Sequence, residues 1–201
     1  KENFREISQK NLSRSEKRNL DDVVAGRYQG KWFIQSRNQP DVKELPRDDV
    51  FKKLGLIDDR ELGVVFSHVL WDANLFYGKD LFEDYGEWFA ETTKAACLNT
   101  NLNWLIKMHP ANLWKRQRDG VRKEYSEVKI IEDQIGKLPD HVKLVYPDTQ
   151  ISTMTLLGIA NYAITVRGTI STEAPTFGVT TLTAGTGRCD GFGFTVDSDS
   201  R

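Results

Sequence analysis

Five short apolar segments that alternate with helical stretches constrain the fold of this 201-residue chain more than any other feature. Each segment is rich in branched or aromatic residues and ends at turn-forming residues, as β-strands do. They lie at residues 62–67, 103–108, 142–146, 162–166 and 179–184. Strands that alternate with helices are joined by right-handed crossovers and form a parallel sheet with helices on both faces. The sequence therefore predicts an α/β, Rossmann-like fold.

Helical segments fill the intervals between these strands. The clearest one covers residues 80–99, where apolar residues recur at helical spacing and Asp80 is placed to act as the N-terminal cap. Further helices are predicted at residues 122–138, 153–160 and 171–178.

Residues 1–60 differ in character from the rest of the chain. They are charged and compatible with helix, but their apolar residues are too sparse for a strong apolar stripe, and the proline-containing stretch 35–49 is typical of an extended connector. We interpret residues 1–60 as a helical segment and linker from a preceding domain, and residues 61–201 as the folded domain. We also expect the chain to be a piece of a longer protein.

Composition narrows the range of partners. The formal net charge of -1 provides no general positive field that would attract nucleic acid. Cys97 and Cys189 lie in unrelated contexts without the paired spacing of a metal site, so we expect reduced thiols and no bound metal. No apolar run approaches the roughly 18 residues of a membrane span. We expect a cytoplasmic location, which is compatible with peripheral association at the inner face of the membrane.

The loop after the fourth strand carries the most informative polar residues. In an open parallel sheet the ligand lies beyond the carboxyl ends of the strands, where this loop would be. Gly168 relieves crowding, and Thr169, Ser171 and Thr172 supply hydroxyls. A helix that begins near Ser171 would direct free N–H groups at an anion such as phosphate, and Glu173 could accept hydrogen bonds from a ribose. The same residues also suit a simple helix cap with a favourable first-turn glutamate.

Histidines near the strand ends are the candidates for acid–base or hydrogen-bonding chemistry. His109 follows the second strand directly and precedes Pro110, so it either caps the strand or faces a site. Its position at the same edge as the loop after the fourth strand favours a site, where it would donate a hydrogen bond to a phosphate oxygen or act as a general acid. His68, after the first strand, is a second candidate. His141 precedes the third strand and is discounted because it lies at the opposite edge.

The glycine-rich stretch 185–193 follows the fifth strand. It lacks the Lys-Ser/Thr of a P-loop and does not follow the opening strand, so it matches neither of the two nucleotide fingerprints in full. A mobile loop is one interpretation, and a loop in which Arg188 pairs with a phosphate or a sugar carboxylate is the other. Patterns typical of hydrolase triads and zinc sites do not occur, and Asp72 and Asp148 are isolated carboxylates.

Three motifs occur together in the second half of the chain. They are the His-Pro pair at 109–110, the Ser-Thr-Glu-Ala run at 171–174 after a strand and a glycine, and the glycine-rich form of residues 185–193. With these motifs, residues 61–201 resemble the carboxyl-terminal, nucleotide-sugar-binding domain of GT-B glycosyltransferases. The resemblance is greatest to the capsule polysaccharide biosynthesis group, which includes bacterial Kdo transferases.

The resemblance implies a role for individual residues. His109 would contact the nucleotide phosphate region, Ser171 and Thr172 would bind phosphate, Glu173 would contact the ribose, and Tyr146 would lie beside the base. It also implies a metal-independent transferase without a cofactor, whose nucleotide-sugar donates to a saccharide or glycolipid acceptor. The amino-terminal domain that usually supplies the general base is missing, so we expect this chain to be inactive alone.

Three functions fit these observations. The first is the donor domain of a glycosyltransferase that extends a surface (capsular) polysaccharide. The second is a nucleotide-sugar 2-epimerase, which shares the fold and a similar glutamate loop and would release free nucleotide with epimerised sugar in the absence of an acceptor. The third is a non-catalytic GT-B-like domain, which would bind a nucleotide or a partner protein without turnover.

Overall fold

The computed structural model describes residues 6–28, 44–70, 79–118, 120, 124–187 and 189–200. The chain divides into two compact units, Lys1–Val42 and Lys43–Arg201. Among the described residues, none of the helices combines the length and the apolar character needed to cross a membrane.

In the first unit, helix α2 (Arg14–Tyr28) begins at a capping box. The Ser13 N–H donates to the Glu16 carboxylate at 2.8 Å, and the Glu16 N–H donates to Ser13 Oγ at 3.3 Å. These reciprocal bonds satisfy two of the donors that every helix start leaves open. Hydrogen bonding from Ser13, together with the Lys10 ammonium, lowers the pKa of Glu16 to about 2. The helix predicted in this region is confirmed.

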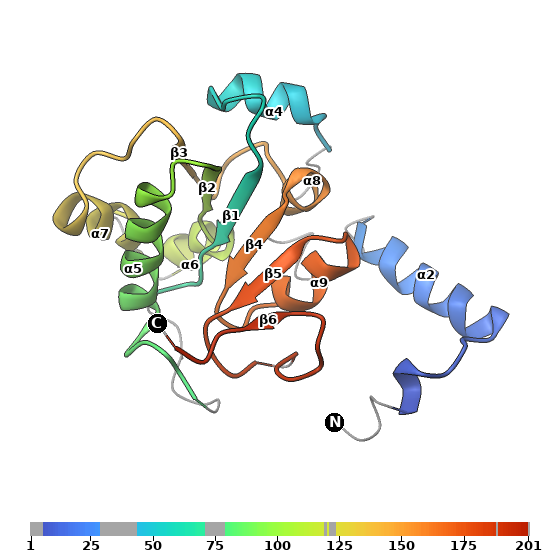
Figure 1. The fold of residues 1–201 in the computed structure, drawn as a ribbon. Coiled ribbons are helices and arrows are strands. Elements are labelled where there is room, and N and C mark those ends of the chain that lie inside the picture. Colours follow the sequence, from blue (N-terminus) through green and yellow to red (C-terminus); the bar gives the residue numbers. More distant parts are fainter. Residues whose placement is uncertain are drawn as a thin grey trace. The chain divides into compact units, whose positions relative to one another are not determined.

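The second unit is built on a six-stranded parallel sheet with strand order β3-β2-β1-β4-β5-β6 (Figure 1). The strands are β1 (Leu62–Phe66), β2 (Asn103–Lys107), β3 (Val142–Val145), β4 (Tyr162–Thr165), β5 (Thr180–Thr183) and β6 (Val196–Asp197). The five predicted strands and the α/β class are confirmed. Strand β6 was not predicted, because a two-residue strand gives no periodic signal.

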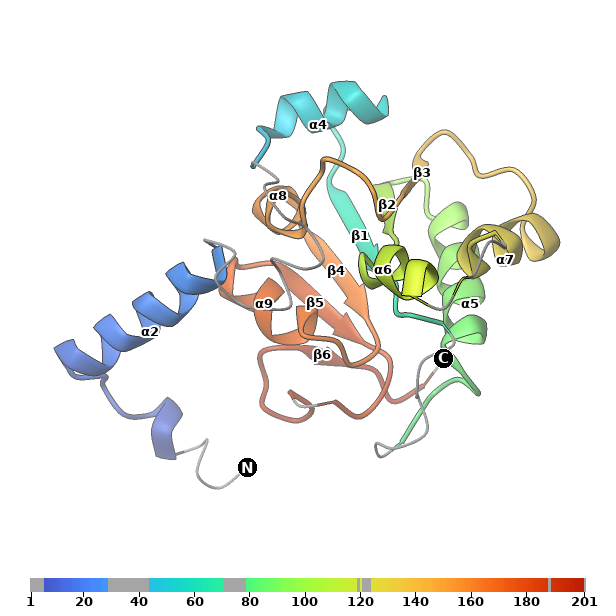
Figure 2. The same ribbon diagram turned by 180° about the vertical axis from the view of Figure 1, so that it is seen from behind.

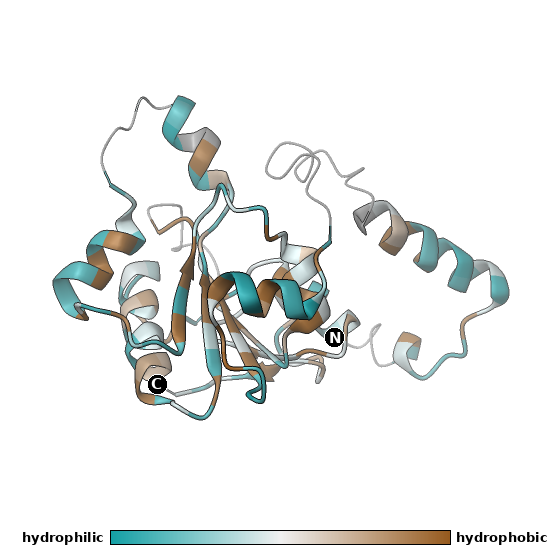
Figure 3. Cartoon of the chain, turned by 90° about the horizontal axis from the view of Figure 1, so that it is seen from above, coloured by the Kyte–Doolittle hydropathy of each residue, from teal (hydrophilic) through white to brown (hydrophobic). Residues whose placement is uncertain are grey.

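Helices cover both faces of the sheet, as predicted (Figure 1, Figure 2). Helices α5 (Tyr85–Leu98) and α7 (Ser126–Gln134) pack on one face around Trp88, Phe89 and Ile131. Helices α4 (Arg47–Leu54), α8 (Thr153–Ile159) and α9 (Ile170–Thr176) pack on the other face. Helix α6 (Ala111–Arg118) follows β2. Figure 3 shows the strands as a mainly hydrophobic layer between more polar helices, which is the pattern of a sheet buried on both faces.

Helix α5 begins later than the sequence predicted. Its N-terminal cap is Asp84, whose Oδ1 accepts a hydrogen bond from the Glu87 N–H at 2.8 Å. The Glu87 carboxylate in turn accepts from the Glu83 N–H at 2.6 Å, so the helix start is stabilised twice. The prediction of Asp80 as the cap is wrong, because Asp80 instead pairs with Gly185 and forms an ion pair with Arg167.

Helix α4 belongs to the second unit, although its residues fall in the stretch that we interpreted as segment and linker. Val50 and Phe51 are 0% and 1% exposed, and both join the core on the α8 and α9 face. Gly55, with φ of 62°, ends the helix in the left-handed conformation that glycine adopts most easily. The second compact unit therefore starts at Lys43. A single pair of apolar residues in a short helix gives no periodic pattern from which this packing could be predicted.

Candidate functional site

The carboxyl edge of the sheet brings together residues from the loops after β1, β2 and β4. The strand order changes direction between β1 and β4, and such a switch point is where open α/β sheets bind ligands. A Cβ atom added to Gly168, after β4, would lie 3.4 Å from Cε1 of His68, after β1. His109 follows β2, the strand next to β1, and acts electrostatically on His68.

His68 holds the ends of β1 and β4 together. Its Nε2 accepts a hydrogen bond from the Val166 N–H at 3.1 Å and lies 3.1 Å from Thr165 Oγ1. The ring stacks on Tyr85 with a centroid distance of 4.3 Å. Burial, with smaller contributions from His109 and Arg167, lowers the pKa of His68 to about 3. A neutral imidazole that already accepts a backbone hydrogen bond positions the two loops and is poorly suited to acid catalysis.

His109 has a defined tautomer in this arrangement. Its Nδ1 accepts a hydrogen bond from the Ala111 N–H at 3.1 Å, at the start of α6. An accepting Nδ1 carries no proton, so the neutral ring carries its proton on Nε2. This geometry suits a hydrogen-bond donor to a phosphate oxygen. A general acid would need the imidazolium, whose formation would break the bond to Ala111.

The turn between β4 and α9 differs in part from the prediction. Helix α9 begins at Ile170, and the N–H groups of Ser171, Thr172 and Glu173 donate to the carbonyls of Gly168 and Thr169 at 2.9 to 3.0 Å. These three N–H groups are therefore engaged, and the expectation that free N–H groups start near Ser171 is corrected. A backbone contact to an anion here would have to come from residues 168–170.

The hydroxyls of this turn differ in accessibility. Ser171 is buried, and its Oγ donates to the Gly168 carbonyl at 2.8 Å. Thr169 and Thr172 are exposed, and Thr172 Oγ1 lies 3.2 Å from the sulfur of Cys189. Cys189 also lies 3.5 Å from Ser171 Oγ, so the stretch after β5 packs against α9. The threonines are thus the more accessible of the predicted phosphate ligands. Glu173 lies partly buried in the first turn of α9.

Aromatic residues lie together beyond the end of β3. Tyr146 is 44% exposed, and its ring meets that of Tyr125 edge-on at a centroid distance of 6.2 Å. The Arg116 guanidinium lies over the other ring, 4.2 Å from the Tyr125 centroid. Such a cluster offers faces on which a nucleobase can stack. Sequence reasoning found Tyr146 but missed the other two, because they come from a different part of the chain. Arg188 and Asp72 lie outside the described residues.

Sequence analysis also did not predict two buried charged side chains near the carboxyl edge of the sheet. Lys107, the last residue of β2, is 2% exposed, and its ammonium has no hydrogen-bond partner in the part of the chain that the structure describes. Glu127, in the first turn of α7, accepts hydrogen bonds from Ser67 Oγ at 3.2 Å and from Asn112 Nδ2 at 3.0 Å. Burial raises the pKa of Glu127. The buried charge could have been predicted from the sequence, because a lysine ends the otherwise mainly apolar segment 103–107.

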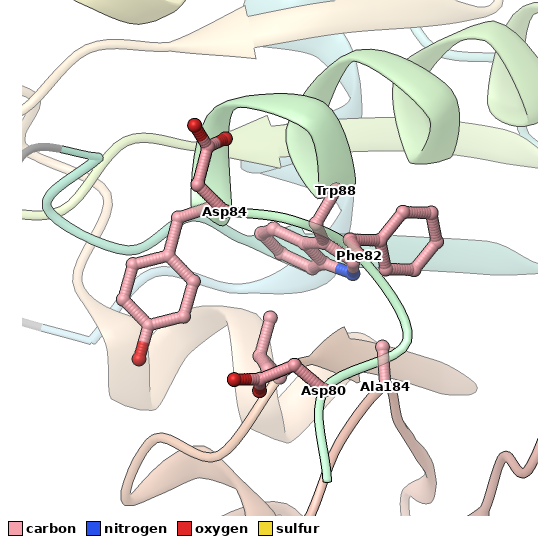
Figure 4. A pocket seen from close by; sticks show the side chains of 7 residues that line it. Asp80, Phe82, Asp84, Trp88 and Ala184 are labelled. Atoms are coloured by element: carbon pink, nitrogen blue, oxygen red, sulfur yellow. The ribbon is translucent and has the colours of Figure 1, made fainter. Parts of the chain in front are cut away.

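The structure has a small cavity beside the contacts of His68, because Tyr85 and Val166 contribute to its lining (Figure 4). Its lining consists of Asp80, Phe82, Asp84, Tyr85, Trp88, Val166 and Ala184. At about 10 Å³ it has room for one water molecule and none for a nucleotide. Within the described ranges, no three His, Cys, Asp or Glu side chains gather as a metal site would require.

Comparison with solved structures places the fold in a class. No protein-family model and no curated protein sequence matches the chain. The beta Kdo 2,4 transferase KpsC of Thermosulfurimonas dismutans matches with a TM-score of 0.52 and 19% identity, over 80% of this chain and 43% of its own. The UDP-GlcNAc 2-epimerase of Neisseria meningitidis, bound to UDP-GlcNAc, matches with a TM-score of 0.43 and 15% identity, over 68% and 32%. MnaA of S. aureus, solved with UDP, gives 0.44 and 17%, over 69% and 31%.

The match to KpsC defines the class of fold. The second unit is an α/β domain with a Rossmann-like parallel sheet. It has the fold of one half of a GT-B protein such as KpsC, as the sequence resemblance implied. The chain spans less than half the length of the three matched proteins.

Proposed function

We propose that this chain is the donor-binding part of a GT-B glycosyltransferase, which transfers a sugar from a nucleotide-sugar to a growing surface (capsular) polysaccharide. One observation carries the proposal. His109, Gly168 and the α9 turn lie at one edge of the sheet, at the point where the strand order changes direction. The fold shared with KpsC supports it.

The geometry suggests how the donor would lie along this edge. The base would stack near Tyr146 and Tyr125, the ribose would meet Glu173, and the phosphate would lie between His109 and the turn at Gly168. Hydrogen bonds from His109 Nε2–H and from the exposed threonines would stabilise the charge that develops on the leaving nucleotide. We therefore include metal-independent transfer without a cofactor in the proposal. The saccharide or glycolipid acceptor and the general base would be contributed by another domain.

Calorimetric titration with CMP, CDP, UDP and GDP tests the proposal. We expect one nucleotide to bind clearly and His109→Asn to weaken its binding by about 1–3 kcal/mol, the cost of a lost hydrogen bond to a charged group. Asparagine is the matched variant because its side-chain oxygen can still accept from the Ala111 N–H, while the Nε2 donor is lost. An unchanged melting temperature would verify the fold. Unchanged affinity in this variant would contradict the assignment of His109.

Activity assays on a protein that also carries the acceptor domain separate the competing functions. Sugar transfer to an acceptor is the expected result. Release of nucleotide and epimerised sugar without an acceptor would identify a 2-epimerase instead. Nucleotide binding without either reaction would identify a non-catalytic domain.

A further inference from the structure

Lys107 occupies a position from which its side chain reaches the ligand edge. It is the last residue of β2 and lies in register between Phe66 of β1 and Val145 of β3. Side chains alternate along a strand, and Leu105 belongs to the core beneath α4, α8 and α9. Lys107 therefore projects to the same face, which also carries α9, and it precedes His109 by two residues.

The Lys107 ammonium is buried without a hydrogen-bond partner among the described residues. The residue is 2% exposed, and Nζ has no hydrogen-bond acceptor among the described residues. A buried cation is costly unless it is paired or hydrogen-bonded. Asp148, which follows β3, is an exposed carboxylate that acts on Lys107 electrostatically without a hydrogen bond to it. Within the described part of the chain, this buried positive charge is therefore offset electrostatically but has no hydrogen-bonded counter-charge.

We infer that Lys107 is the cation of the ligand site and that a phosphate group of the bound nucleotide is its counter-charge. This inference rests on the proposed function and adds to it a binding residue and an anionic ligand class. A phosphate can act as the counter-charge of Lys107 because it carries up to two negative charges and several acceptor oxygens. Lysine meets phosphate as a point charge, which suits an ammonium that approaches from a buried stem.

Substitution of Lys107 can distinguish a phosphate-binding lysine from a purely structural one. Replacing a buried, unpaired charge by an apolar side chain of similar length removes a desolvation cost, so Lys107→Met should keep or raise the melting temperature in the absence of ligand. If Lys107 binds phosphate, the same variant should bind ligand more weakly. A gain in stability together with a loss of affinity distinguishes a binding residue from a structural one.

The first test is calorimetry on the full chain with inorganic pyrophosphate and with CMP, CDP, UDP and GDP. We expect the Kd of the tightest ligand to rise at least about tenfold in Lys107→Met. The matched control is Lys143→Met, because Lys143 lies on the neighbouring strand in register with Leu105 and is only partly buried. The control should bind as the unchanged protein does.

A second measurement needs no variant. Burial lowers the pKa of Lys107 to about 8, so about half of the molecules lack this proton at pH 8 and about a tenth lack it at pH 7. A phosphate that pairs with the ammonium restores the proton. Binding enthalpies in buffers of different ionisation enthalpy should therefore show an uptake of about half a proton at pH 8, which falls towards a tenth at pH 7 and disappears in Lys107→Met.

Each outcome separates the inference from the function on which it rests. Nucleotide binding that Lys107→Met leaves unchanged would overturn the inference and leave the proposed function intact. Pyrophosphate binding that depends on Lys107, with no preference for any nucleotide, would support the cation site and count against the donor domain. Absence of binding by every probe would overturn both.

Discussion

At the scale of the residue, Lys107 links the stability of the protein to pH. Its pKa in the folded state is about 8, against an ordinary value of 10.5, because burial disfavours the ammonium. Between these two values the unfolded chain binds more protons than the folded one. The free energy of unfolding therefore rises with pH across this window, by up to about 3 kcal/mol from this residue.

Lys107→Met should abolish this contribution. Below pH 8 the unchanged protein carries the full cost of the buried charge, so the variant should be the more stable of the two, and the difference should shrink as the pH rises towards 10.5. Urea unfolding of both proteins at pH 7, 8, 9 and 10 measures the difference. Curves that stay parallel over this range would show that the amine is not buried as described.

At the scale of the element, Glu127 joins three parts of the carboxyl edge. Its carboxylate, on α7, accepts hydrogen bonds from Ser67 after β1 and from Asn112 on α6. Glu127→Ala would leave the buried Asn112 amide without this acceptor, which should lower the free energy of unfolding by about 1–3 kcal/mol, whereas the Ser67 hydroxyl keeps the His68 carbonyl as an acceptor at 3.0 Å. Glu127→Gln is the matched variant because it keeps the volume and one acceptor oxygen. A loss below about 0.5 kcal/mol in Glu127→Ala would mean that water replaces the carboxylate.

The ionisation of Glu127 gives a second prediction at this scale. Burial raises its pKa above the ordinary value of 4.5, so the folded state keeps the proton after the unfolded chain has lost it. This contribution to stability is complete below pH 4.5 and is lost as the pH rises through the raised folded pKa. Chemical unfolding between pH 4 and 8 should show this decline, and Glu127→Gln should not show it. An identical decline in both proteins would assign it to other groups.

The close packing of β1 against β2 at Gly63 predicts that a single added methyl group destabilises the fold. A Cβ on Gly63 would lie 2.4 Å from the ring of Trp104, its partner in register. Gly63→Ala should therefore destabilise the sheet by about 1–3 kcal/mol, the range for overpacked cores. Gly158→Ala, in α8, is the control, because a Cβ there meets nothing within 4 Å and alanine favours helix by about 1 kcal/mol. Opposite shifts of the two melting temperatures are expected, and equal shifts would contradict the packing.

At the scale of the whole molecule, the features that could be predicted from the sequence are those that depend on local residue patterns. The strand at 103–107 and the helix after Asp84 carry their own periodicity, so the class of fold and the edge at which the parallel strands end could be predicted. The burial of Lys107 and the packing of Phe51 depend on residues distant in the chain, which no local pattern reports. The engaged N–H groups of the α9 turn likewise follow from the exact residue at which the helix starts, where sequence-based boundaries are least certain.

The boundary between the two compact units gives a prediction for the whole molecule. A chain of residues 43–201 should unfold at the same temperature as the second unit of the full chain, because it keeps the whole of this compact unit, with α4 in its core. A chain of residues 61–201 loses Val50, Phe51 and Leu56 from the core. At about 1.5–3 kcal/mol for each buried apolar side chain, the loss is comparable to the typical total of 5–15 kcal/mol. Thermal unfolding followed by circular dichroism should show the shorter chain largely unfolded. If it melts like the longer one, α4 does not contribute to the core.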